Sequence, residues 1–168
     1  MSLGMYNATI PMLKQLLGGL SKNLDKAAAF AEAKKVDPLV LTGSRLAPDM
    51  FALARQVQIA SDQARGGVAR LAGVEMPAMT DTETTIDELK ERIAKTIAYL
   101  DSFTPAQIDG SEDREITLKM RAGELKFTGA HYLTQWIIPN FTFHCTTAYN
   151  ILRHNGVEIG KRDFLGAA

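Results

Sequence analysis

Two polar side chains, one helical turn apart, are the first candidates for chemistry in this chain. Asn140 and His144 belong to a stripe of residues that recur every three or four positions between 128 and 156. An imidazole there can bind a metal ion, transfer a proton or donate a structural hydrogen bond. The amide can orient a ligand or water, or satisfy the carbonyl of Gln135 that Pro139 leaves free. Because the stripe is otherwise apolar, the pair must be hydrogen-bonded, hydrated or used in function.

Other reactive side chains near this pair are weaker candidates. Cys145 follows His144, but consecutive helical residues point about 100° apart, which argues against a Cys–His nucleophile. We expect His131 to be exposed, and His154 to interact with the helix dipole in the last turn. The chain has no phosphate-binding loop, nucleophile elbow, zinc-peptidase motif or di-iron E-x-x-H pair. His144 is therefore the candidate catalytic residue, and both an enzyme and a binding protein are compatible with it.

The stretch that carries the pair is predicted to be one long helix. Thr128 is suited to its N-cap and Gly156 to its C-terminal end. Pro139 is predicted to bend the helix near its middle. The tail after Gly156 is too short for another element, but Phe164 and Leu165 give it an apolar end.

Three further stretches with helical spacing predict the elements that must position this pair. They run over residues 3–30, from Pro48 to Leu71, and from a capping box at Thr84 and Asp87 to Thr104-Pro105. Small residues on the second stretch would allow a neighbouring helix to approach closely. Gln56 and Gln63 lie beside its apolar face, and the simplest interpretation of both is a solvated flank.

A change of period precedes the last helix. Apolar and polar residues alternate over 114–127, with a turn at Arg121-Ala122-Gly123, which predicts a short β-hairpin. Four amphipathic helices and this hairpin predict an all-α four-helix bundle in a single domain, 1–168. The long connections around the second helix and the hairpin are compatible with crossover connections.

Composition narrows the range of partners. The 168 residues include 19 basic and 19 acidic side chains, so no overall field draws the chain to nucleic acid. No apolar run reaches the roughly 20 residues of a membrane helix. There is one cysteine, and the first residues lack the layout of a signal peptide. We therefore expect a cytoplasmic protein without nucleic-acid or membrane partners.

Three stretches resemble a known family. LAPDMFALARQVQIASD at 46–62, TTIDELKERIAKTIAYLDS at 84–102 and PNFTFHCTTAYNILRHNGVEIGKRDFLG at 139–166 are similar to segments of the DinB/YfiT-like superfamily, in an uncharacterised bacterial branch. This resemblance implies a four-helix bundle, often dimeric, in which three histidines bind a divalent metal. One comes from the second helix and two, as H-x-x-x-H, from the last. Some metal-bearing relatives transfer low-molecular-weight thiols or isomerise thiol adducts.

The resemblance also implies which residues occupy the metal positions. Aligned on the L-R-x-x-G ending, His144 falls on the second histidine of the pair and Asn140 replaces the first. The second-helix ligand falls near Gln56 or Gln58. Amide oxygens bind zinc or nickel more weakly than imidazole does, so we expect a degenerate site without a metal cofactor.

Two functions agree with these residues. In the first, Gln56, Asn140 and His144 bind a small organic ligand in the remnant of the metal site. In the second, the chain is a non-enzymatic homodimeric module, and helix faces or the apolar tail contact the partner.

Overall fold

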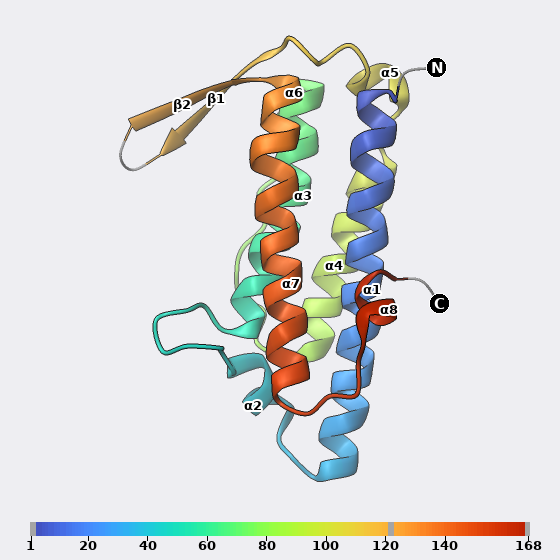
Figure 1. The fold of residues 1–168 in the computed structure, drawn as a ribbon, viewed down its shortest axis with the longest axis vertical. Helices are drawn as coiled ribbons and strands as arrows, with labels where there is room; N and C mark the ends of the chain where they lie inside the picture. Colours follow the sequence, from blue (N-terminus) through green and yellow to red (C-terminus); the bar gives the residue numbers. More distant parts are fainter. Residues whose placement is uncertain (1–2, 121–122, 167–168) are drawn as a thin grey trace.

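The structure is a computed structural model that describes residues 3–120 and 123–166. Its elements in chain order are α1 (Met5–Lys34), α2 (Pro38–Gly43), α3 (Leu53–Ala72), α4 (Ile86–Asp101), α5 (Pro105–Ile108), β1 (Glu115–Met120), β2 (Gly123–Thr128), α6 (Gly129–His131), the π-helix η1 (Tyr132–Ile137), α7 (Ile138–His154) and α8 (Lys161–Phe164). Figure 1 shows the long helices side by side, with the hairpin projecting from them. The predicted mostly helical fold with a hairpin before the last helix is confirmed.

The long helices surround one apolar core. α3 packs against α4 and α7, and α1 packs against the same two helices. The apolar stripes of the sequence supply this core, with side chains such as Leu17, Val57, Leu89 and Ile151 almost fully buried. Among the described residues, no helix combines the length and apolar character needed to cross a membrane.

Helix boundaries differ from the predictions where side-chain caps or turns decide them. α4 is capped by Thr85, whose hydroxyl accepts from the Glu88 amide while the Glu88 carboxylate accepts from the Thr85 amide. The predicted capping box at Thr84 and Asp87 was therefore one residue early. α3 begins at Leu53 rather than Pro48, because the preceding residues form a turn in which the Met50 amide donates to the Ala47 carbonyl.

The last helix is continuous from α6 to α7 but changes its winding before Pro139. Its second segment, η1, is a π-helix, and the Ile138 amide donates to the Leu133 carbonyl five residues earlier. The side-chain amide of Asn140 donates to the carbonyl of Trp136 at 2.8 Å. Asn140 thus satisfies a carbonyl of the helix, which was one of the roles predicted for it. The carbonyl is that of Trp136, however, and not the predicted one of Gln135.

Two small elements, the hairpin and the tail, accompany the long helices. β1 and β2 pair antiparallel from Glu115↔Thr128 to Met120↔Gly123, and the predicted turn residues 121–122 lie outside the described residues. Ile116 and Leu118, two residues apart on β1, are buried and form the inward face of the strand. The tail forms one helical turn, α8, which packs on α1, so the expectation that it was too short for another element was wrong.

Candidate functional site

Gln56 and His144 meet at the interface of α3 and α7. The Gln56 side chain is buried, with 1% of its surface exposed, so its interpretation as a solvated flank was wrong. Its Nε2 donates to the Phe51 carbonyl at 3.1 Å, and its Oε1 lies 2.7 Å from Nδ1 of His144. The close packing of α3 on α7 brings the two side chains together, although 88 positions separate them in the chain.

The Phe51 carbonyl fixes the protonation pattern of this pair. A carbonyl oxygen can only accept, so Gln56 must direct its NH₂ group toward Phe51 and its oxygen toward His144. Because that amide oxygen also only accepts, Nδ1 of His144 must carry the proton. In the neutral ring, Nε2 then holds the lone pair and can accept a hydrogen bond or a proton.

The surroundings keep the imidazole neutral. Burial, and then the positive charge of Arg55, lower the pKa of His144 below its ordinary value of 6.5. The His144 ring is half-buried, and the exposed Phe143 ring meets it edge-on with centroids 5.2 Å apart. The ring is therefore an uncharged base beside an aromatic side chain.

The two other amides near the expected metal positions have different roles. Gln58 is buried like Gln56, but it donates to the carboxylate of Glu83 at 3.1 Å and accepts from Arg55 at 3.3 Å. Asn140, one turn before His144, is bound to the Trp136 carbonyl. Of the two glutamines that the resemblance left open, the structure thus brings Gln56 to the imidazole.

This donor set does not fit a tightly bound transition metal. The Gln56 oxygen is occupied by the proton on Nδ1 of His144, which leaves Nε2 as the one strong nitrogen donor of the three predicted residues. Within residues 3–120 and 123–166, no cluster of three or more His, Cys, Asp or Glu side chains is arranged to hold a metal ion.

The remaining candidates lie apart from this pair. Cys145 is buried, and burial raises the pKa of its thiol to about 12, so it carries almost no thiolate at neutral pH. His131 and His154 are exposed at the two ends of the last helix, as expected.

A shallow cavity opens on the outer side of α7, next to Phe143. Its volume is about 570 Å³, and apolar side chains from the loop before α3, Leu46 and Met50, form its other wall. Leu46, Phe51 and Phe143 each expose 40% or more of their surface. Phe143, which meets the imidazole edge-on, lines this cavity, whereas His144 itself does not.

Sequence reasoning missed a buried cation at the centre of an ionic cluster. Arg92 of α4 is fully buried and contacts Asp62 at 2.7 Å, Asp81 at 2.9 Å and Glu83 at 2.9 Å. It also donates to the Thr80 carbonyl at 3.0 Å. The acids of the irregular segment 73–85, here called the connector, show no periodicity that would have indicated this role. An arginine amid the apolar positions of the α4 stripe was the available signal.

Comparison with known proteins agrees with the helical architecture and the hairpin. A crystal structure of a DinB family member protein from Shewanella denitrificans matches with a TM-score of 0.89 and 47% sequence identity, over 97% of this chain and 92% of that one. The comparison with curated proteins finds no match. The fold is thus that of a DinB-like protein.

A family model described as "Domain of unknown function (DUF1993)" matches residues 5–165. The chain belongs to this family, and the predicted resemblance to an uncharacterised DinB-like branch is confirmed.

Proposed function

We propose that this protein is a DinB-like four-helix bundle that binds a small organic ligand at His144, in a metal-free remnant of the superfamily site. One observation carries the proposal: the Phe51 carbonyl orients Gln56, which holds the proton of His144 on Nδ1. The lone pair on Nε2 is then available to a ligand. Nε2 forms no hydrogen bond with any residue that the structure describes.

The surroundings of the imidazole indicate the ligand's chemistry. A neutral ring accepts hydrogen bonds at Nε2, so the ligand carries an O–H or N–H donor. Phe143, whose ring meets the imidazole edge-on, favours an aromatic or apolar body for that ligand. A neutral imidazole with a lowered pKa can also act as a weak general base toward such a donor.

A matched pair of probes tests ligand binding. Phenol carries the donor, whereas fluorobenzene has a similar shape without it. We expect phenol to shift the ¹⁵N resonance of His144 Nε2 saturably, and fluorobenzene to leave it unchanged. Followed by ligand-observed NMR of phenol, a His144→Gln variant should lose binding, whereas His154→Gln, at an exposed position of the same helix, should retain it. Equal shifts with both probes would contradict the proposal.

The metal-free part of the proposal has its own measurement. Isothermal titration with zinc and nickel should show no tight binding to the unmodified protein, because the amide at Gln56 is engaged and Asn140 offers no imidazole. Asn140→His should increase the affinity by adding the second imidazole of the H-x-x-x-H pair. Tight zinc binding by the unmodified protein would refute the loss of the metal.

A second candidate function is the homodimeric module. The exposed apolar side chains Leu46 and Phe143, which line the α7 cavity, favour it, because monomers seldom expose such a cluster. Sedimentation should then show a dimer that Leu46→Glu dissociates, while Leu3→Glu, at another exposed apolar position, has no effect. A monomer at all workable concentrations would exclude this function.

The tail after Gly156 could also contribute to self-association, and this can be tested separately. α8 already packs on α1 of the same chain, where Lys26 pairs with Asp163 at 2.6 Å. A chain that ends at Gly156 should therefore retain the association state of the full chain, and sedimentation of both would show it.

A further inference from the structure

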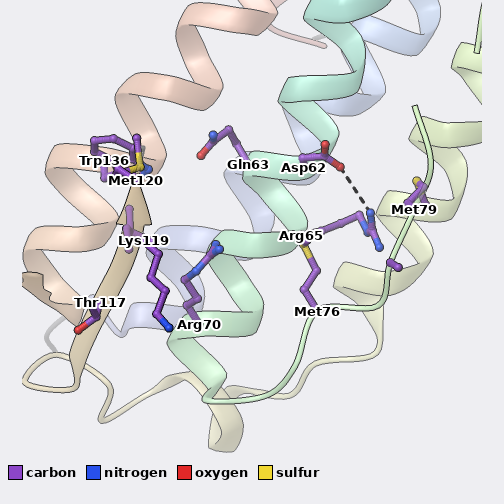
Figure 2. A pocket seen from close by; sticks show the side chains of 12 residues that line it. Asp62, Gln63, Arg65, Arg70, Met76, Met79, Thr117, Lys119, Met120 and Trp136 are labelled. Atoms are coloured by element: carbon purple, nitrogen blue, oxygen red, sulfur yellow. Dashed lines mark ion pairs between the residues drawn. The ribbon is translucent and has the colours of Figure 1, made fainter. Parts of the chain in front are cut away.

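A second cavity lies between α3, β1 and the connector, away from His144. Its volume is about 670 Å³, within the range of sites for small molecules. Gln56 and Arg70 are 14 positions apart on α3, so the cavity's cationic end lies about 20 Å along the helix from the His144 site. Figure 2 shows the side chains that line it, with Arg70 from α3 and Lys119 from β1 facing the same opening.

The charges of this cavity are unbalanced. Three cations, Arg65, Arg70 and Lys119, line it together with one carboxylate, Asp62. Asp62 is already paired with the buried Arg92 at 2.7 Å. Neither Arg70 nor Lys119 forms an ion pair with any residue of the described ranges.

Arg70 is held in place rather than free in solvent. Its Nη1 donates to the hydroxyl of the buried Tyr132 at 3.1 Å. Gly66 makes room for it, because a Cβ at that position would lie 2.7 Å from Arg70 Nη1. A guanidinium positioned in this way loses little conformational freedom when it binds an oxyanion.

Arg65 adds a buried cation to the wall of the cavity. Only 2% of its surface is exposed, and it donates to the Pro77 carbonyl. Its Nη1 lies 3.5 Å from Asp62 Oδ1 and makes no hydrogen bond with the described residues. Buried guanidinium nitrogens are ordinarily hydrogen-bonded, so a donor without an acceptor at this place is unusual.

The rest of the wall is apolar and adaptable. Trp136 of η1 is half-buried, and three methionines, Met76, Met79 and Met120, complete this part of the cavity. In Figure 2, Trp136 and Met120 lie on one side of the opening, and Arg65 and Met79 lie on the other. Unbranched thioether side chains adjust to ligands of varied shape.

We infer that this cavity binds an organic oxyanion whose head group pairs with Arg70 and Lys119 and whose apolar body packs on Trp136 and the methionines. The head group is a carboxylate or a phosphate monoester, since both offer the oxygens that an arginine and a lysine bind. The site is independent of the proposed function at His144.

Trp136 provides the measurement, because it is the one tryptophan in the sequence and lines the cavity. Hexanoate, hexyl phosphate and hexanol share an apolar chain and differ in the head group. We expect one or both anions to shift the Trp136 emission saturably to the blue, and hexanol to have no saturable effect. Saturation by hexanoate alone identifies a carboxylate site, and saturation by hexyl phosphate alone identifies a phosphate site.

Variants that remove one positive charge each test the two cations, and Lys126→Gln on the same hairpin as Lys119 is the matched control. Lys119→Gln should weaken anion binding about tenfold, the effect of one charge-assisted hydrogen bond. Arg70→Gln should do the same. Lys126→Gln removes an exposed lysine of β2 that does not line the cavity, and should change the affinity by less than about twofold. Urea midpoints confirm that all three variants are folded.

Three results would overturn the inference. Hexanol could bind as well as the anions, Lys126→Gln could weaken binding as much as Lys119→Gln does, or no probe could give a saturable signal up to about 10 mM. None of these outcomes depends on the state of His144, so the two proposals fail separately.

Discussion

At the scale of single residues, the hydrogen bond between Gln56 and His144 links the fold to protonation. Gln56 accepts a hydrogen bond from Nδ1–H with an uncharged amide oxygen, so it places no negative charge beside the ring. Burial and Arg55 therefore lower the pKa of His144 without an opposing charge. Ligand binding through the Nε2 lone pair should accordingly persist below pH 6.5 and decline only as the pH falls through the lowered pKa.

A carboxylate in place of the amide should reverse this effect. In Gln56→Glu the negative charge beside Nδ1–H stabilises the imidazolium, so the pKa of His144 rises and the ligand is lost at a higher pH. The glutamate also cannot donate to the Phe51 carbonyl, which should reduce stability by about 1 kcal/mol. Long-range ¹H–¹⁵N NMR titration of His144 measures the pKa directly.

Gln63→Glu is the control for this measurement. It makes the same charge change on α3, but it lies seven residues, or roughly 10 Å, further along the helix. Its effect on the pKa of His144 should be small. An unchanged or lower pKa in Gln56→Glu would show that the Gln56–His144 contact does not control protonation.

The sequence predicted part of this residue-scale geometry. Helical spacing indicated that His144 faces the other helices, and the resemblance narrowed its partner to Gln56 or Gln58. The choice between the two depends on the Phe51 carbonyl and on Glu83, which hold the glutamines in different directions. Both contacts come from irregular segments, whose course no periodicity describes.

At the scale of elements, the ion pairs of Arg92 hold the connector against α3 and α4. It is surrounded by Asp62, Asp81 and Glu83, which lie on α3 and the connector. Arg92→Met would leave these three partly buried carboxylates without their common cation. We expect a loss of roughly 3 kcal/mol in the free energy of unfolding, measured by urea denaturation.

Two further variants separate charge from geometry at this position. Arg92→Lys keeps the positive charge but cannot contact several carboxylates with a planar fork, so its loss should be intermediate. Lys95→Met removes a cation of α4 whose pair with Glu91 is exposed, and should cost less than about 0.5 kcal/mol. Equal stability of Arg92→Met and Lys95→Met would show that the ion pairs of Arg92 do not stabilise the connector.

The contact between α3 and the last helix depends on a glycine. A Cβ at Gly67 would lie 2.8 to 3.1 Å from three side-chain carbons of Ile137, which is fully buried. We expect Gly67→Ala to lower stability by about 1 to 3 kcal/mol, because overpacking outweighs the gain in helix propensity. Thermal or urea unfolding measures the difference.

A second helical glycine gives the opposite expectation. Gly18 of α1 has no atom within 4 Å of its added Cβ, so Gly18→Ala should stabilise the protein by about 0.5 to 1 kcal/mol. Stabilisation by both substitutions would show that α3 and the last helix can separate at Ile137 without cost.

The small residues of α3 were correctly predicted to permit close approach of a neighbouring helix. The π-helical segment that contains Ile137 was not predicted, because Pro139 indicated only a bend.

At the scale of the whole molecule, Cys145 is a probe of global opening. It lies in the middle of α7, almost fully buried, and burial raises the pKa of its thiol to about 12. Since a thiol reagent requires both access and thiolate, labelling at pH 8 should proceed through unfolded molecules. The logarithm of the labelling rate should therefore rise with urea with the same slope as global unfolding.

An exposed cysteine in the same chain calibrates this rate. Ala94 lies on the exposed face of α4, so Ala94→Cys adds a thiol that should react at once while Cys145 in the same molecule stays protected. A stability of 5 kcal/mol or more predicts a ratio of at least about 1000 between the two rates. If Cys145 reacted as fast as the added thiol without urea, the α7 core would open locally. The Gln56–His144 contact, one residue away on that helix, would then be no fixed feature of the fold, because an opening that admits the reagent also separates α7 from α3.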